Sequence, residues 1–336
     1  MNGFLIANKP TGITSSNLVV FVRKRLPRGT SVGHGGTLDP EASGVLPICV
    51  GSATRLFDYI IDKTKTYVAE LQLGVETDTQ DATGAVVREL PVRVGEREIA
   101  EVLPEFTGEI EQIPPMYSAI KRGGKRLYQL ARKGETVEVE ARKCRVDGIE
   151  LIGKCGEHRY RIRVHCGKGV YIRTLCHDIG RRLGCGGHMA SLERVQAGVF
   201  KLEDALTREQ IDAAAAAGTL EELLLPLDAP LGYLPAVRVG EKARHAVING
   251  NPLKPRWLNA PAPDCEAVRV YLNDTFAGIG QPQPDGSVRF KAMLLPREAA
   301  QSPTSSEDTA KPYRRSVAAT GCESIVGQPR SGEDCP

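Results

Sequence analysis

Hydrophobic positions recur with helical spacing near the start of the chain. Leu18, Val22 and Leu26 lie three or four residues apart and so share one face of a helix. One of the hydroxyl residues at 14–16 caps the beginning of this helix, and Pro27 ends it. The pattern predicts an amphipathic helix followed by a glycine-rich loop.

Alternating apolar positions then predict strands. Tyr67, Ala69, Leu71 and Leu73 point to one side of a half-buried strand, and the run at 45–50 is apolar and β-prone. Further elements are a short helix at Glu98–Phe106, strands at Val137–Ile152 and Tyr160–Cys166, and a helix whose apolar face holds Ile172, Leu175, Cys176, Ile179 and Leu183. This mixture predicts an α+β fold with a mixed, largely antiparallel central sheet flanked by helices.

Proline residues and a change of pattern divide the chain. Pro226, Pro230 and Pro235 interrupt the helical pattern, and beyond them Val268–Leu272 and Phe276–Gly280 read as short strands between turns. We therefore expect a domain at 1–230 and a compact β-barrel domain at 235–296. Residues 297–336 contain few apolar side chains, so we expect a disordered tail.

Composition adds the class of protein. With 41% hydrophobic and 25% charged residues, the chain reads as a soluble globular protein. The N-terminus has no export pattern and no stretch could span a bilayer. Nine scattered cysteines argue against a disulfide framework, and together these features predict a cytoplasmic protein.

Charge is distributed unevenly. The segment 121–182 contains 17 Lys and Arg against 7 Asp and Glu, a net charge of +10, with Tyr128, Tyr160 and Tyr171 interleaved. Cations with aromatic rings suit a nucleic acid whose bases stack, although a solvated surface gives the same composition. Overlapping the start of this segment, the excursion at about 113–134 has the prolines, glycines and cations of a basic RNA-binding insertion. Its cations are Lys121, Arg122, Lys125, Arg126, Arg132 and Lys133.

One acidic residue stands in a restrained loop at 33–47. Asp39 is preceded by Gly33, Gly35 and Gly36, which permit close approach of another backbone, and Pro40 forces it toward an extended conformation. A rigidly presented carboxylate suits a nucleophile, whereas the same residue types also build ordinary turns.

This loop resembles the motif of the TruB family of pseudouridine synthases, the bacterial enzymes that modify uridine 55 of tRNA. Further stretches that resemble the family are 65–67 (KTY), 73–84 (LGVETDTQDATG), 114–119 (PPMYSA), 123–128 (GGKRLY) and 168–175 (KGVYIRTL). The resemblance covers residues 1–230, and the following β unit more loosely resembles the family's PUA-type RNA-binding domain.

The resemblance implies a role for individual residues. It makes Asp39 the catalytic nucleophile, Tyr67 the ring that stacks on the uracil, and Arg173 the cation paired with Asp39. Tyr171 and Leu192 would line the uridine pocket. In the same comparison, His34 would pack into the T-loop where the uridine has left its stack.

The chemistry fits these residue types. Moving the sugar bond of uridine from N1 to C5 involves no redox change, so neither a cofactor nor a metal is required. The carboxylate must stay ionised, and a guanidinium opposes the rise in pKa that burial causes. Arg173 falls in the first turn of its helix, where the dipole disfavours a cation, so helix stability does not explain it. Tyr67, in contrast, could equally be a core residue.

Three other interpretations remain open. A structural zinc site would use the cysteines and histidines between Cys155 and His188, but no Cys-x-x-Cys pair occurs there. An RNA-binding module that folds tRNA without chemistry would show the same charge pattern. A guide-dependent pseudouridine synthase of the H/ACA type shares the carboxylate loop, whereas the long insertion favours a stand-alone enzyme. We expect a monomer that acts on the tRNA T-arm without an obligate protein partner or a membrane.

Overall fold

The structure is a computed structural model that describes residues 1–61, 63–118, 120–122, 124–131, 137 and 139–295. Residues 297–336, predicted to be a tail, lie outside this range. Among the described residues, no helix is both long and apolar enough to cross a membrane.

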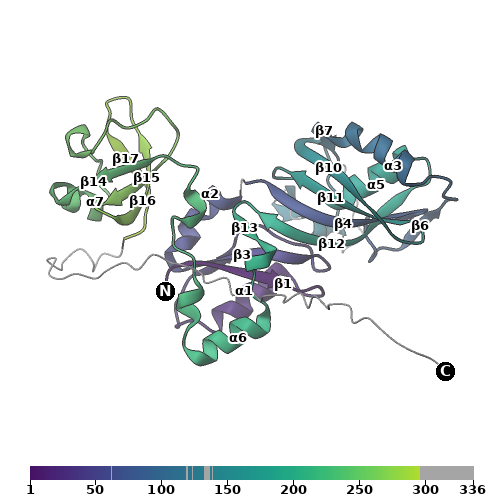
Figure 1. Ribbon diagram of the computed structural model, residues 1–336, viewed down its shortest axis with the longest axis horizontal. Coiled ribbons are helices and arrows are strands. Elements are labelled where there is room, and N and C mark those ends of the chain that lie inside the picture. The colour runs from purple at the N-terminus through teal and green to yellow at the C-terminus, as the bar shows by residue number, and fades with distance from the viewer. Residues whose placement is uncertain (62, 119, 123, 132–136, 138, 296–336) are drawn as a thin grey trace, which may run out of the picture. The chain divides into compact units, whose positions relative to one another are not determined.

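A mixed nine-stranded sheet organises most of the chain (Figure 1). Its main path runs β1 (Gly3–Lys9), β3 (Ser43–Val50), β12 (Gly187–Ala197), β4 (Lys65–Leu73), β11 (Arg159–Cys166), β10 (Arg142–Gly156) and β7 (Gly108–Gln112). β2 (Val32–His34) pairs with β3, and β13 (Phe200–Lys201) with β12. Neighbours are antiparallel except β3 and β12, whose short parallel pairing joins the two halves of the sheet. The predicted α+β class with a largely antiparallel sheet is confirmed.

Four further short strands form two hairpins. The first pairs β5 (Val75–Thr77) with β6 (Val86–Glu89), and the second pairs β8 (Lys121–Arg122) with β9 (Lys125–Arg126).

Helices pack on both halves of the sheet. They are α1 (Ser15–Arg23), α2 (Phe57–Ile61), α3 (Glu96–Val102), α5 (Ile172–Arg182) and α6 (Arg208–Ala217), whereas α4 (Leu127–Ala131) directly follows the β8–β9 hairpin. The Thr14 hydroxyl accepts a hydrogen bond from the Asn17 amide and so caps α1, one of the alternatives that the sequence left open. The helix predicted at Glu98–Phe106 is observed as α3 followed by the 3-10 helix Leu103–Phe106.

Two apolar clusters hold the sheet between its helices. One joins β4, β11 and β12 to α5, where Leu71, Leu175 and Ile179 have no exposed surface. The other packs α1 and α6 against β1 and β3. Because full burial of a leucine or isoleucine contributes about 1.5–3 kcal/mol, these clusters fix the layers that carry the site.

The C-terminal sheet corrects one prediction. β14 (Ala236–Val239), β15 (Val268–Leu272), β16 (Thr275–Pro282) and β17 (Val288–Met293) form a four-stranded sheet in that order. Among the described residues its edge strands β14 and β17 do not pair, so the expected closed barrel is not present. The segment between β14 and β15 forms α7 (Arg244–Ile248) and makes only single bridges, at Leu253 and Leu258, instead of further strands.

Candidate active site

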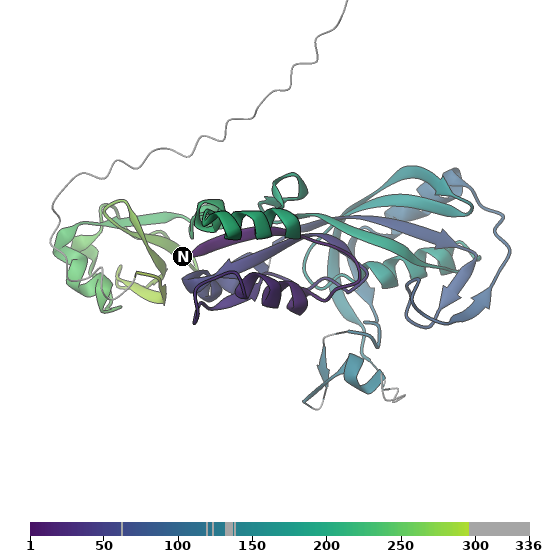
Figure 2. The ribbon, with the colours of Figure 1, turned by 90° about the horizontal axis from the view of Figure 1, so that it is seen from below.

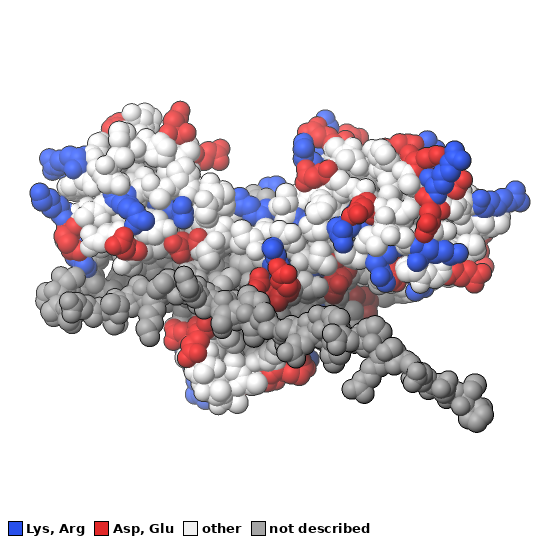
Figure 3. All heavy atoms as spheres, in the orientation of Figure 1, with Lys and Arg blue, Asp and Glu red and all other residues white. Residues whose placement is uncertain are grey.

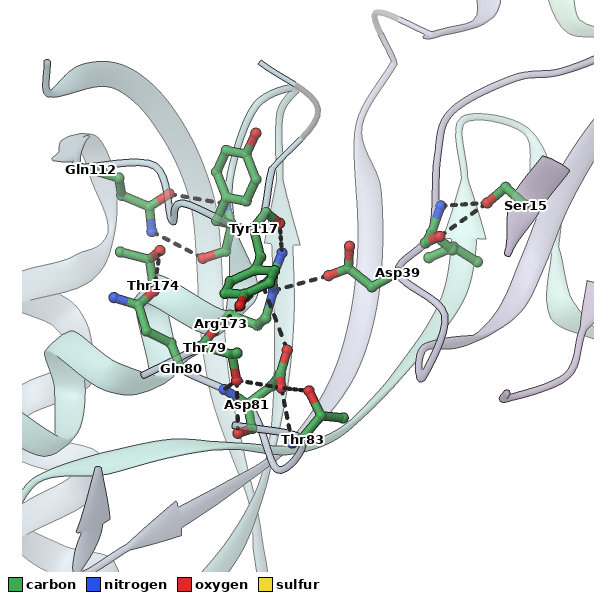
Figure 4. Close-up of polar contacts among 12 residues, drawn as sticks. Ser15, Asp39, Thr79, Gln80, Asp81, Thr83, Gln112, Tyr117, Arg173 and Thr174 are labelled. Atoms are coloured by element: carbon green, nitrogen blue, oxygen red, sulfur yellow. Dashed lines mark hydrogen bonds and ion pairs between the residues drawn. The ribbon is translucent and has the colours of Figure 1, made fainter. Parts of the chain in front are cut away.

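The loop between β2 and β3 carries Asp39 and is held on both sides of it. Ser15, in the first turn of α1, donates a hydrogen bond through Oγ to the Leu38 carbonyl (3.0 Å) and accepts one from the Leu38 amide (2.9 Å; Figure 4). On the other side, the Pro40 carbonyl accepts from the Gly12 amide at 3.0 Å and from Lys9 Nζ at 2.9 Å. The backbone of the loop is therefore fixed before any substrate binds.

Lys9 is a fully buried cation beneath this loop. Its Nζ also donates to the carbonyls of Pro10 (2.8 Å) and Ile13 (2.7 Å). Burial lowers the pKa of Lys9 to about 8, against the opposing effect of the Glu41 and Asp39 carboxylates. The three carbonyls satisfy the ammonium, so Lys9 acts here as an anchor.

Arg194 is a second buried cation at the loop, and it is only 1% exposed. It projects from β12, and its Nε donates to the Val45 carbonyl at 2.7 Å while Nη2 donates to the Gly36 carbonyl at 3.1 Å. These acceptors lie on opposite sides of Asp39 in the sequence, so one guanidinium ties the two ends of the loop together. Arg194 was not among the site residues predicted from the sequence.

Asp39 is paired with Arg173. The distance from Arg173 Nε to Asp39 Oδ2 is 3.0 Å, and Arg173 is 5% exposed whereas the Asp39 side chain is 41% exposed (Figure 4). Arg173 Nη2 also donates to the Tyr117 carbonyl at 2.9 Å, at the base of the insertion. A buried cation thus holds a carboxylate that remains partly exposed to solvent.

Asp81 completes this network and was also missed. Its Oδ2 lies 3.5 Å from Arg173 Nη1, and its Oδ1 accepts hydrogen bonds from Thr79 Oγ1 (2.7 Å) and from the Thr83 amide (3.0 Å) and hydroxyl (2.6 Å). The signal was present in the stretch 73–84, where Asp81 stands between two threonines. A fixed second carboxylate thus contacts another nitrogen of the same guanidinium and helps to orient Arg173.

The pKa of the Asp39 carboxyl is raised above its ordinary value. Burial by the surrounding protein is the largest cause and Asp81 adds to it, while Arg173 and Lys9 lower the pKa. The carboxylate is therefore less solvated than a surface aspartate, which favours its use as a nucleophile.

Tyr67 and Leu192 lie on neighbouring strands next to the loop. Tyr67 on β4 is opposite Arg194 on β12, and both Tyr67 and Leu192 pack in the cluster that contains Leu38. Burial raises the pKa of the Tyr67 phenol, and nearby Arg194 opposes this rise. Tyr67 therefore stays a neutral ring at the edge of the core.

Tyr171 precedes α5 and is held by Gln112. The side chain of Gln112 accepts from the Tyr171 amide at 3.0 Å and donates to its carbonyl at 3.2 Å. This two-point contact fixes the chain just before Arg173, and Gln112 is another positioning residue that the sequence analysis did not identify.

His34 ends β2, and its Nδ1 has no hydrogen-bond partner among the described residues. Burial and the charge of Arg194 lower its pKa, so the imidazole is neutral at pH 7.

The structure describes some of the basic residues of the insertion and not others. Lys121, Arg122, Lys125 and Arg126 form the β8–β9 hairpin, whose backbone is described but whose side chains are not. Arg132 and Lys133 lie outside the described residues.

The cysteines expected for a zinc alternative are dispersed. No group of three His, Cys, Asp or Glu side chains suited to a metal occurs in the described part of the chain. Burial raises the pKa values of Cys166 and Cys176 to about 12, which disfavours the thiolate that zinc requires.

Solved structures share this architecture. A Cbf5-Nop10-Gar1 complex contains a chain that superposes with a TM-score of 0.68 and 28% identity, covering 90% of this chain and 87% of that one. An archaeal box H/ACA sRNP Nop10-Cbf5 complex gives a TM-score of 0.66 and 25% identity, covering 90% of this chain and 89% of the other.

Matches to protein-family models identify the class of protein to which the chain belongs. Residues 24–172 match the TruB family pseudouridylate synthase N-terminal domain, and residues 173–232 match the tRNA pseudouridylate synthase B C-terminal domain. The fold and these matches define a pseudouridine synthase, which is an isomerase.

Two curated relatives extend the match over most of the chain. The tRNA pseudouridine synthase B of Aromatoleum aromaticum is 41% identical over 301 residues, which is 90% of this chain and 95% of the relative. That of Ectopseudomonas mendocina is 44% identical over 299 residues, which is 88% of this chain and 95% of the relative. The chain belongs to the TruB family of pseudouridine synthases.

Proposed function

We propose that this protein converts uridine 55 in the T-loop of tRNA to pseudouridine, with Asp39 as the nucleophile. The observation that carries the proposal is the pairing of Asp39 with the buried Arg173 at 3.0 Å, in a loop fixed by Lys9, Ser15 and Arg194. The curated relatives named tRNA pseudouridine synthase B support the substrate.

The reaction balances without an external reagent. The bond from N1 to C1′ of the sugar breaks, a bond from C5 to C1′ forms, C5 loses a proton and N1 gains one. The Asp39 carboxylate attacks C1′ or C6, or assists departure of the base through a glycal, and all three routes need it ionised. Arg173 supplies the positive charge that keeps it so.

The residues around Asp39 are assigned roles in binding the uridine and the RNA. Tyr67 stacks on the uracil that has left its stack, and Leu192 and Tyr171 line the uridine pocket. His34, which is neutral and whose Nδ1 has no partner in the described part of the chain, packs into the space that the uridine vacates in the T-loop. The cations of the insertion hold RNA phosphates.

The decisive experiment replaces Asp39 by Asn. On a T-arm stem-loop, Asp39→Asn should form no pseudouridine by mass-resolved mapping while its RNA affinity stays within about threefold of the wild type. Asp58→Asn, an exposed aspartate on α2, is the matched control and should remain active. Wild-type protein that binds the RNA but forms no pseudouridine would instead establish an RNA-binding module without chemistry.

We further propose that the protein acts without a guide RNA. Its identity to the tRNA pseudouridine synthase B relatives exceeds its 28% identity to the Cbf5 chain, and the insertion at 113–134 adds basic residues to its sequence. Purified protein should therefore modify an unmodified tRNA transcript unaided. A strict requirement for added guide RNA would refute this assignment.

The C-terminal unit is proposed to be a PUA-like RNA-binding domain at 235–296. It has a hydrophobic cluster of its own, and Lys254 and Arg256 flank the ring of Trp257 at 5.5 and 5.8 Å. An aromatic ring beside two cations suits contact with RNA.

A further inference from the structure

A second basic surface lies between α1 and β2, outside the active site. We propose that Arg23, Lys24 and Arg28 form this surface, called here the α1–β2 surface, and that it binds backbone phosphates of the helical part of the tRNA. The proposal presupposes the tRNA substrate proposed above and adds a contact site to it.

The first observation is a hollow of suitable composition. A cavity of about 740 Å³ is lined by the three cations together with the hydroxyl residues Thr30 and Ser31, both in the loop that leads into β2. Cations and hydroxyl groups are the side chains that contact phosphate oxygens in nucleic-acid complexes.

The second observation is the absence of neutralising acids. The segment 15–38 contains Arg23, Lys24, Arg25 and Arg28 and no Asp or Glu. Arg25 pairs with Asp212 and lies over the Phe21 ring, so it is part of the packing between α1 and α6. Among the described residues, the three cations of the α1–β2 surface have no carboxylate within ion-pair distance and are exposed.

Charges are arranged differently on the opposite side. Figure 2 shows α1 and the β8–α4 excursion toward the lower edge of the view, with α6 above α1, and both helices pack on the same face of β1 and β3. Figure 3 views the molecule from the other side, where cations and carboxylates are intermixed. Elsewhere in the chain exposed arginines are paired, as in Arg97–Glu101 and Arg182–Glu105. An unneutralised basic cluster is therefore not a general property of this surface.

The third observation is continuity with the active site. Val32 lines the hollow and begins β2, and His34 ends the same strand. Two residues along a strand span about 7 Å, so RNA that touches His34 has further phosphates within reach of the α1–β2 surface. The loop of the RNA would lie at Asp39 and its adjoining helix over this surface.

The test removes two of the charges. Lys24→Gln/Arg28→Gln is preferred because Arg23 also donates to the Val32 carbonyl at 3.1 Å and supports the fold there. Arg97→Gln/Arg182→Gln is the matched control, since it removes two exposed cations that are already paired. Thermal unfolding should show the same midpoint for both variants and the wild type.

Binding is read by fluorescence anisotropy at several salt concentrations, with a T-arm stem-loop and with a full tRNA transcript. Since each phosphate contact contributes about 0.7–0.9 to the slope of log affinity against log salt, the test variant should lose about 1.5 from this slope. Its Kd should rise about tenfold near physiological salt, and the control should behave as the wild type.

The two RNAs locate the contact. A defect with both means that the surface holds the T-stem, and a defect with full tRNA alone means that it holds the helix beyond the stem. Both results support the α1–β2 surface. Unchanged Kd and slope with both RNAs, or an equal change in the control, would overturn it.

The binding measurement does not depend on the isomerisation. A wild-type protein that shows the expected salt slope and its loss in the variant, but forms no pseudouridine, would refute the proposed function and leave the α1–β2 surface intact.

Discussion

At the scale of single residues, the site is built around buried cations. Arg173 is paired with Asp39 and Asp81, whereas Lys9 and Arg194 donate hydrogen bonds to backbone carbonyls. Such bonds are costly to break, because a buried group left unpaired costs about 1–3 kcal/mol. The positions of these cations, rather than their net charge, fix the carboxylate.

The pH dependence of catalysis should report the Asp39–Arg173 pair. Since burial raises the pKa of Asp39, single-turnover rates should fall on acidification at a pH above the ordinary range of an aspartate. Arg173 lowers that pKa, so Arg173→Met should move the inflection to still higher pH and reduce the plateau roughly a hundredfold. Arg182→Met, on the exposed side of α5, is the control. An unmoved inflection in Arg173→Met would show that Arg173 does not govern the ionisation.

Arg194 should prove a positioning residue. A lysine supplies one ammonium and cannot reach carbonyls at both ends of the loop, so Arg194→Lys should lower kcat about a hundredfold with little change in KM. It should also lower the free energy of unfolding by about 2–4 kcal/mol, because buried carbonyls lose their donors. Urea denaturation and steady-state kinetics measure the two effects. Full activity of Arg194→Lys would contradict this role.

At the scale of elements, the joint between β3 and β12 sets the loop. Gly44 pairs with Arg194 across it and has a φ of 102°. A Cβ at Gly44 would stand 2.3 Å from the Arg194 carbonyl oxygen and 2.8 Å from its nitrogen. The two strands approach too closely there for any side chain.

Gly44→Ala should therefore destabilise the protein more than its backbone conformation alone requires. We expect a loss of about 3 kcal/mol or more in the free energy of unfolding, since strain and overpacking add. Gly218→Ala, at the left-handed cap of α6 with open space around it, should cost only about 1–2 kcal/mol. Equal losses in urea denaturation would mean that the close approach at Gly44 is relieved cheaply.

Local patterns predicted the elements whose burial follows from their own sequence. The helical spacing of Leu18 and Val22 and the alternation of Ala69 and Leu71 gave α1 and β4 because each has one apolar face. β12 was not predicted, because buried polar residues such as His188 and Arg194 interrupt its apolar pattern. Their partners include the Val45 carbonyl, 149 residues away, which no local window contains.

The residues of the candidate site also divide into those that the sequence indicated and those that it did not. The resemblance brought Asp39, Arg173, Tyr67 and Leu192 to attention, and the structure places them in neighbouring elements. Asp81, Gln112, Lys9 and Arg194 escaped notice because they act on other residues, through contacts that form only in the folded chain. Strand ends were displaced too: the strand expected at Val137–Ile152 is β10 at Arg142–Gly156, which bends around irregular pairings.

At the scale of the whole molecule, the C-terminal sheet has its own core. Eleven buried residues cluster within 237–288, while Ile279 and Leu294, with the partly buried Ala267, Phe276 and Ala292, pack in a separate cluster that includes Phe4 and Val45. The single tryptophan, Trp257, packs against the C-terminal cluster and so reports on it alone.

Unfolding in urea should therefore show two midpoints. Trp257 fluorescence should follow the C-terminal sheet, and far-ultraviolet circular dichroism should follow mainly the nine-stranded sheet. Separate transitions would support the proposed division of the chain near residue 230. Superimposed transitions would indicate one cooperative unit in which the shared cluster dominates.

The bonds from Arg194 to both ends of the Asp39 loop also bear on when the enzyme becomes competent during its synthesis. Val45 leaves the ribosome 149 residues before Arg194, an interval of about 10–30 s at ordinary translation rates. Throughout that time the nascent chain displays Asp39 without Arg194, and for most of it also without its partner Arg173. We therefore expect a stalled chain ending before β12 to leave RNA unmodified, because the strand that carries Arg194 is made after the strands on either side of the loop.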